Sequence, residues 1–282
     1  MYIVEIIIPV YNDNISLSII LNEINKIKSE KYIFNVTVID DFSEKPVFEL
    51  IKPNLYKNIK SIKVLRLNSN MGHQKAISIG LYDSINGNSK FILIMDGDGE
   101  DSPNNIVKLL DVALEKKCIV VASRNSRYES VVFKFSYFLY CLLFFLSTGL
   151  RMNFGNFSVI PRVFIKDVLN LKSCGIHYPA TILKSCIKLE YVSLDRCKRY
   201  QGSSKMNFLG LVLHGFKSFV VFKQKITLRL IILYSLSILL VIFTDFLIPF
   251  LLLNIPVLFL LLMQEPKPLD YKNIIFSKLL LK

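Results

Sequence analysis

The stretch FILIMDGDGEDSP, residues 91–103, joins five apolar residues directly to four carboxylates. A short apolar run bounded by turn residues is typical of a buried strand. In an extended segment alternate residues share a face, so Asp96, Asp98 and Glu100 can point the same way, and the glycines between them leave room for a ligand. Three oxygen ligands on one side suit Mg²⁺ or Mn²⁺. The alternative is an acidic turn that only caps the next helix.

Apolar, β-branched runs recur around this stretch and alternate with segments of helical spacing. We expect strands at residues 4–10, 34–40, 62–67, 90–96 and 118–123. Strands that are apolar throughout and separated by helices predict an α/β fold, with a mainly parallel sheet covered by helices on both faces. Ligands of such sheets bind beyond the carboxyl ends of the strands, where the acidic stretch lies.

The composition limits the class of protein. The chain has 282 residues, of which 52% are hydrophobic, and 35 Lys and Arg against 22 Asp and Glu give a formal charge of +13. Such a charge suits an anionic lipid surface or a ligand that bears phosphate. Nucleic acid is the competing interpretation, and we expect no nucleic-acid partner. The five cysteines form no CxxC pair, which favours a reduced, cytosolic setting.

Several short motifs together resemble a known family. In chain order they are IIIPVYND, VIDDFS, LNSNMGHQKAISIGL, MDGDGEDSP, ASRNSR, FGNFSVIPR and RYQGSSKM, followed by a hydrophobic segment. In this order they resemble the family 2 glycosyltransferases of GT-A fold, and most of all the polyprenyl-phosphate and dolichyl-phosphate sugar transferases. The resemblance covers roughly residues 3–265, and seven motifs in register are more specific than any one alone.

The resemblance implies site residues, a metal and a substrate class. It implies that a nucleotide sugar, expected to be UDP-linked, contacts Pro9, Tyr11, Asp41, Gly72, Lys75 and Asp96. It implies that Mg²⁺ or Mn²⁺ is held by Asp96, Asp98 and Glu100, the last standing where the family usually has Gln. Phosphate and acceptor contacts are expected from Arg124, Arg127, Arg199, Ser203, Ser204 and Lys205. His73 is a minor candidate, with helix capping as the alternative.

The chain departs from the family at Asn156, where related transferases carry an Asp that is often assigned as the base. An amide cannot accept a proton at neutral pH. One explanation is a phosphate monoester acceptor, which is already largely ionised and needs no strong base. Another is that Asp98 or Asp101 takes the role of the base. A catalytically silent nucleotide-binding subunit is the third.

The C-terminal region predicts attachment to a membrane. Residues 230–264 carry Asp245 as the only formal charge, and one straight helix of that length would exceed a hydrocarbon core of about 30 Å. We therefore expect a transmembrane hairpin at 226–264, then a basic cytosolic tail at 265–282. Residues 131–150 and 208–225 are expected to be interfacial helices. The catalytic domain, 1–207, would lie on the cytosolic face.

These expectations combine into one hypothesis. The chain is predicted to be an integral-membrane GT-A transferase that moves a sugar from a nucleotide donor to polyprenyl phosphate. Transfer to a hydroxyl of a lipid-linked or surface glycan is the alternative within enzymes. The sequence does not name the sugar, and a homo-oligomer stays open.

Overall fold

The structure is a computed structural model that describes residues 1–124, 131–202, 208–244 and 271–281. The chain divides into two compact units. The first, here called the sheet unit, comprises Met1–Tyr128, Asn153–Lys205 and Pro268–Lys282. The second, the helical unit, comprises Glu129–Met152 and Met206–Lys267.

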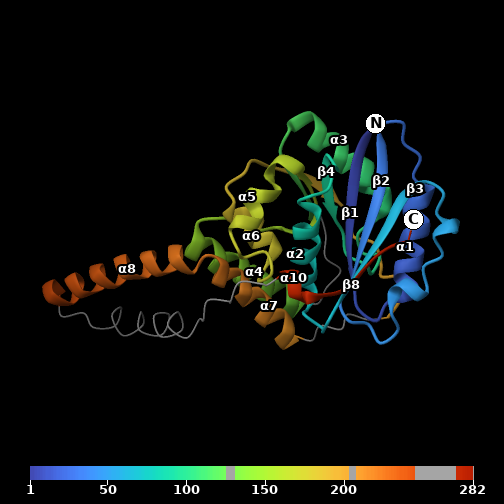
Figure 1. The fold of residues 1–282 in the computed structure, drawn as a ribbon. Helices are drawn as coiled ribbons and strands as arrows, with labels where there is room; N and C mark the ends of the chain where they lie inside the picture. Colours follow the sequence, from blue (N-terminus) through green and yellow to red (C-terminus); the bar gives the residue numbers. More distant parts are fainter. Residues whose placement is uncertain (125–130, 203–207, 245–270, 282) are drawn as a thin grey trace. The chain divides into compact units, whose positions relative to one another are not determined.

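The sheet unit alternates strands and helices along much of its length (Figure 1). Its strands are β1 Tyr2–Val10, β2 Tyr32–Asp40, β3 Ile59–Leu67, β4 Phe91–Ile94, β5 Ile119–Arg124, β6 Phe154–Pro161, β7 Leu189–Leu194 and β8 Ile275–Leu280. Its α-helices are α1 Asn14–Lys26, α2 His73–Ser84, α3 Ile106–Lys116, α5 Ile165–Asn170, α6 Tyr178–Lys184 and α10 Tyr271–Ile274. Short 3₁₀ helices lie at Val47–Glu49, Pro53–Leu55, Pro103–Asn105 and Arg162–Phe164.

The strands form one sheet in the order β7-β5-β6-β4-β1-β2-β3-β8. Strand β1 pairs in parallel with β2 and β4, β2 pairs in parallel with β3, and β5 with β7. Strands β6 and β8 pair antiparallel with their neighbours. The predicted mainly parallel sheet is confirmed, and the carboxyl ends of β1, β2 and β4 lie next to one another.

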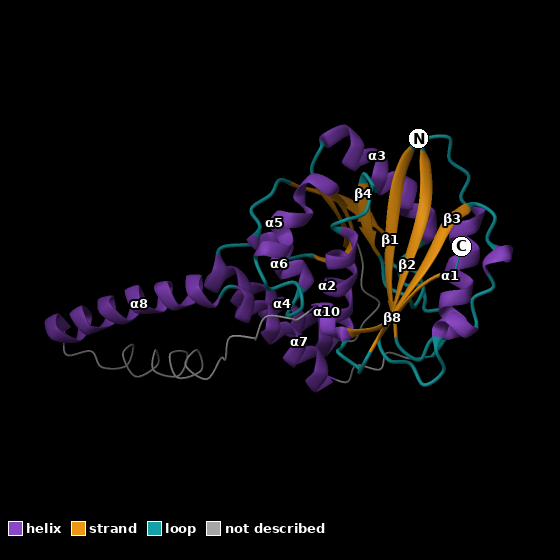
Figure 2. Cartoon of the chain, viewed as in Figure 1, coloured by secondary structure: helices purple, strands orange, loops and turns teal. Residues whose placement is uncertain are grey.

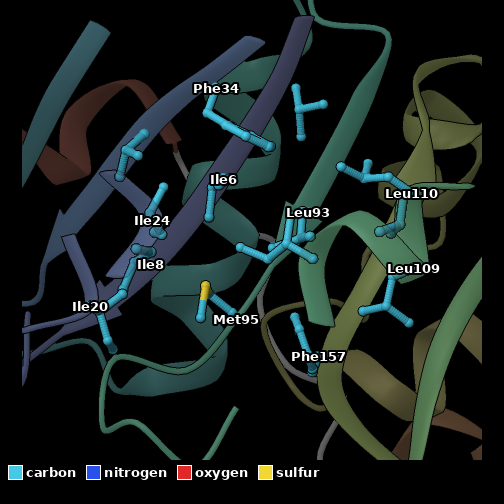
Figure 3. Packing of buried hydrophobic residues seen from close by; sticks show 14 of the residues in the cluster. Ile6, Ile8, Ile20, Ile24, Phe34, Leu93, Met95, Leu109, Leu110 and Phe157 are labelled. Atoms are coloured by element: carbon cyan, nitrogen blue, oxygen red, sulfur yellow. The ribbon is translucent and has the colours of Figure 1, made fainter. Parts of the chain in front are cut away.

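Helices cover both faces of the sheet (Figure 2). On one face Ile6 and Ile8 of β1 belong to a buried cluster with Ile24 of α1 and Leu109 of α3 (Figure 3). On the other face α2 packs closely, because a Cβ at Gly80 would lie 2.6 Å from Cγ2 of Ile7. Because apolar side chains point to both faces of β1, its sequence is an apolar run interrupted only by Glu5.

The chain returns to the sheet at its C-terminal end. Strand β8 pairs antiparallel with β3, from Lys63 opposite Leu280 to Leu67 opposite Ile275. Just before it, the ring of Tyr271 stacks on that of Tyr82 at a centroid distance of 4.2 Å, and its hydroxyl lies 3.0 Å from that of Ser78. The sequence predicted a basic tail here, whereas residues 271–280 form a short helix and an edge strand of the sheet.

A group of charges fastens β8 to α2 and β3. Asp83 of α2 pairs with Lys278 of β8 at 2.5 Å and with Lys63 of β3, and Lys63 also lies 3.3 Å from Glu5 of β1. The side chain of Asp83 is only 7% exposed. Burial alone would raise its pKa, but the hydrogen bonds and charges of Lys278 and Lys63 outweigh burial and leave the pKa below the ordinary value.

The helical unit contains α4 Val131–Thr148, α7 Phe208–Val221 and α8 Lys223–Thr244. Aromatic rings join its helices: Phe144 of α4 lies 5.6 Å from Phe219 of α7 and 5.7 Å from Phe222. The guanidinium of Arg229 donates to the carbonyl of Leu146 at 2.8 Å. Within the described parts of the chain, no helix combines the length and apolar character required to span a membrane.

The ion pairs of Asp83 predict a loss of stability in acid. Because its folded pKa is depressed, Asp83 stabilises the fold above its unfolded pKa of about 4, and this contribution disappears as the pH falls through the folded pKa. Urea unfolding of the wild type and of Asp83→Asn should differ at pH 7 and converge below pH 4. A constant difference down to pH 3 would contradict this assignment.

Candidate functional site

The acidic loop, residues 95–101, follows β4 at the carboxyl edge of the sheet. Two glycines give it its path. A Cβ at Gly97 would lie 2.9 Å from the carbonyl oxygen of Pro9, and Gly99 has a φ of +89° with the ring of Tyr200 only 2.3 Å from the position of a Cβ. A larger residue at either position would clash, and at Gly99 it would also strain the backbone.

Asp96 lies at the start of this loop and contacts two other elements. Its Oδ1 is 3.0 Å from Nδ2 of Asn156 on β6 and 3.0 Å from Nε2 of His73 at the start of α2. Its backbone N–H donates to Oδ2 of Asp101 at 3.1 Å, so Asp101 closes the loop on itself. His73, a minor candidate from the sequence, therefore lies in direct contact with the acidic loop.

Two arginines neutralise the next two carboxylates. Nη2 of Arg199 forms an ion pair with Oδ2 of Asp98, and its Nε donates to Oε1 of Glu100, each at 3.0 Å. Arg196 pairs with the other oxygen of Glu100. Residues 195–200, here called the arginine segment, also donate backbone N–H groups of Cys197 and Tyr200 to the loop carbonyls of Glu100 and Asp98. The side chains of Asp98 and Glu100 are 19% and 14% exposed.

The pKa of Asp98 reflects this crowding. Burial raises it most, the charge of Asp96 raises it further, and Arg199 and Arg196 oppose both effects. Two neighbouring carboxylates with little solvent need cationic partners to stay ionised together. The arginine segment supplies these partners in the structure.

A second pair of carboxylates, Asp40 and Asp41, lies at the end of β2, beside the end of β1. Asp40 is fully buried, accepts from the N–H of Ser43 at 2.9 Å and pairs with Arg66 at 2.9 Å. Both oxygens of Asp41 accept backbone N–H groups, from Met71 at 2.7 Å and Gly72 at 2.8 Å. Burial raises the pKa of Asp41, and these two hydrogen bonds oppose that rise. Asp41 thus shapes the loop before α2, and its contact with a nucleoside stays a prediction.

The structure places the remaining predicted site residues as follows. Pro9 lies in β1 with its carbonyl against Gly97, Tyr11 follows β1 and is 42% exposed, and Lys75 is half-buried in the first turn of α2. Arg124 is the last residue of β5. The four others, Arg127, Ser203, Ser204 and Lys205, lie outside the described residues.

The fit of a metal ion can be judged from the donor set. Asp96, Asp98 and Glu100 provide the hard oxygen ligands that Mg²⁺ and Mn²⁺ prefer. Across the described residues, however, no three His, Cys, Asp or Glu side chains are arranged to hold an ion. The carboxylate oxygens are therefore suitable ligands for such an ion, but the arginine segment occupies oxygens of Asp98 and Glu100. A cation would have to displace these arginines.

Sequence reasoning missed Arg196 and the roles of Gln74 and Asn156. Arg196 stands three residues before Arg199, and nothing in that spacing connects it with a loop about 100 positions earlier. Gln74 accepts from the N–H of Tyr178 at 2.5 Å and donates to Oδ1 of Asn156 at 3.3 Å. For Gln74, its position directly after the candidate histidine is the signal that the sequence offers.

Comparison with known proteins shows the family of the chain. The family model described as glycosyl transferase family 2 matches residues 5–169, more than half of the chain. An uncharacterised glycosyltransferase of Synechocystis sp. is 26% identical over 230 residues, which are 79% of this chain and 71% of that protein. An undecaprenyl-phosphate 4-deoxy-4-formamido-L-arabinose transferase of Yersinia enterocolitica is 24% identical over 216 residues, 74% of this chain. This chain spans 64% of that relative's length.

Solved structures share the GT-A fold. Glucosyl-3-phosphoglycerate synthase from Mycobacterium tuberculosis, in complex with Mn²⁺, uridine diphosphate and glucosyl-3-phosphoglycerate, has a TM-score of 0.53 at 10% identity and covers 80% of each chain. Mannosyl-3-phosphoglycerate synthase from Rubrobacter xylanophilus has a TM-score of 0.54 at 15% identity, with 81% of this chain and 75% of the other covered. At these identities the likeness concerns the fold alone.

Proposed function

Because the chain belongs to glycosyl transferase family 2, we propose that it transfers a sugar from a UDP-linked donor to a polyprenyl phosphate held in a membrane. The observation that carries the proposal is the acidic loop at the end of β4. It presents Asp96, Asp98 and Glu100 at the edge of the sheet where α/β proteins bind their ligands.

The donor half of the proposal rests on charge. A nucleotide sugar leaves as a diphosphate, and the developing negative charge requires cations nearby. Asp96, Asp98 and Glu100 would hold Mg²⁺ or Mn²⁺, which supplies positive charge to the leaving group. The synthase from M. tuberculosis binds Mn²⁺ with uridine diphosphate, which supports a divalent metal and a UDP-linked donor for this chain.

The arginine segment has a second role in this account. Arg199 neutralises Asp98 and Glu100 while no cation is bound, so cation and arginine compete for the same oxygens. Once released, its planar guanidinium can pair with phosphate oxygens of the donor. The positive charge therefore stays at the site in either state.

The acceptor half rests on Asn156 and on the relative from Yersinia, whose name specifies undecaprenyl phosphate. Asn156 donates to Asp96 and carries no carboxylate that could take a proton. A phosphate monoester has its second ionisation near pH 6, so it attacks already deprotonated at neutral pH. The protein then needs only to position the acceptor with cations.

Exposed apolar side chains of the helical unit favour a membrane location. The largest exposures on α4, α7 and α8 include Phe138 at 62%, Leu209 at 64% and Leu228 at 60%. Surfaces of this kind rest stably in the interfacial region of a bilayer. The predicted transmembrane hairpin at 226–264 begins within α8 and continues into residues outside the described part of the chain.

Transfer to lipid phosphate is tested with membranes that contain the protein, Mn²⁺ and a panel of labelled nucleotide sugars. We expect label in the organic phase, in a form released by mild acid. Asp98→Ala should abolish transfer, because the leaving diphosphate loses its countercharge, whereas Glu115→Ala, which removes an exposed carboxylate on α3, should leave the activity unchanged. Label in an acid-stable product would favour a hydroxyl acceptor, and no transfer from any donor would contradict the proposal.

The topology of the hairpin is constrained by β8. Strands β3 and β8 pair within the sheet unit, so the chain between them must cross the membrane an even number of times or not at all. Two crossings would place Asp245 on the far side from the sheet unit. In an otherwise cysteine-free protein, Asp245→Cys should react with an impermeant maleimide in intact cells. A protein that keeps only the exposed Cys186 of the sheet unit should react only after lysis, and labelling of both residues only after lysis would exclude the hairpin.

A further inference from the structure

A chain of hydrogen bonds leads from the start of α6 to the acidic loop. The backbone N–H of Tyr178, the first residue of α6, donates to Oε1 of Gln74 at 2.5 Å. Nε2 of Gln74 donates to Oδ1 of Asn156 at 3.3 Å, and Nδ2 of Asn156 donates to Oδ1 of Asp96 at 3.0 Å. A continuous series of hydrogen bonds thus links α6, through side chains of α2 and β6, to one carboxylate oxygen.

The backbone N–H of Tyr178 fixes the direction of every hydrogen bond in this series. A backbone N–H can only donate, so the atom of Gln74 that faces Tyr178 must be its oxygen. The amide nitrogen of Gln74 then faces Asn156, which must present its own oxygen there. The nitrogen of Asn156 is left to face Asp96, so the orientation of both amides follows from one backbone group.

The same nitrogen of Asn156 has a second neighbour. Nδ2 lies 2.9 Å from Nε2 of His73, which itself lies 3.0 Å from Oδ1 of Asp96. An amide nitrogen carries two N–H donors, so one can reach Asp96. The other can donate to Nε2 of His73 only when that nitrogen carries no proton, and in that state Nε2 does not donate to Asp96. Gln74 is 7% exposed, and burial favours keeping its hydrogen bonds formed.

We propose that Asn156 and Gln74 are positioning residues that hold the carboxylate of Asp96 in place for the nucleotide donor. This inference rests on the proposed function. Asn156 acts on Asp96 directly as a hydrogen-bond donor, and Gln74 acts on Asp96 only through Asn156. The amide is needed because an aspartate at 156 would have no N–H to donate and would set two carboxylates about 3 Å apart. An aspartate at 156 would need a proton or a cation between the two carboxylates, whereas the amide needs neither.

Two isosteric substitutions test the inference. Gln74→Glu keeps the acceptor for Tyr178 N–H but loses the donor to Asn156, and Asn156→Asp loses the donor to Asp96. Asn156→Asp should weaken the binding of uridine diphosphate in the presence of Mn²⁺ by about tenfold, the effect of a lost hydrogen bond to a charged group. Gln74→Glu should weaken it by no more than that, because it acts through the amide of Asn156, and both should lower kcat/KM. Gln224→Glu, the same change at an exposed position on α8, should alter neither quantity.

A double-mutant cycle separates positioning from general stabilisation. If Gln74 acts only through Asn156, adding Gln74→Glu to Asn156→Ala should not weaken nucleotide binding further. Independent, multiplying losses would overturn the relay, as would full nucleotide affinity and activity in Asn156→Asp. Melting temperatures close to that of the wild type are expected for all variants, and affinities are measured on the folded fraction. A wild-type protein that binds no nucleotide would contradict the proposed function itself, which is a different outcome from unchanged variants.

Discussion

The pairing of Arg199 with Asp98 and Glu100 is the interaction on which the site depends. Strand β4 ends in a loop with four carboxylates in six residues, and two of them have less than a fifth of their side-chain surface exposed. Such a concentration of negative charge is costly away from water unless cations balance it. Arg199 and Arg196 provide that balance, and their backbone neighbours bind the loop carbonyls as well. In the proposed function, a metal ion and a diphosphate would together present complementary charges to the carboxylates and to the arginines.

The sheet supplies the rigidity that this arrangement needs. Strands β4, β1 and β2 are parallel neighbours, so the loops that follow them meet at one edge. The close approach of Gly97 to Pro9 and the burial of Asp40 against Arg66 bind these loops to the strand ends. Helix α2 contributes His73 and Gln74 at this edge, while its far end holds Asp83 and the returning strand β8. One helix therefore links the site with the C-terminal end of the chain.

The sequence predicted the parts of the fold that depend on local pattern. The apolar runs at β1 to β5 are confirmed as strands. Asp96, Asp98 and Glu100 were expected in an extended segment, whereas they lie in a turn after β4, and their binding of a metal stays a prediction. Strand β8 was missed because its partner β3 lies more than 200 residues earlier, and the four lysines of residues 265–282 favour a basic tail. Arg196 was missed for the same reason, since its pairing with Glu100 comes from tertiary folding. The direction of the amide chain through Asn156 requires coordinates, because no sequence pattern states which atom of an amide faces a neighbour.

The central claim is that the acidic loop is a cation site whose charge the arginines balance until a cation arrives. The most direct test is the affinity of the protein for Mn²⁺ in the absence of nucleotide, measured by electron paramagnetic resonance. The wild type is compared with Arg199→Gln and Lys198→Gln. Lys198 lies in the same segment and is exposed, so its removal controls for a general loss of positive charge. The account predicts that Arg199→Gln binds Mn²⁺ about tenfold more tightly, since a charged hydrogen-bonding competitor is removed, while Lys198→Gln binds as the wild type does. Equal or weaker binding in Arg199→Gln would contradict it.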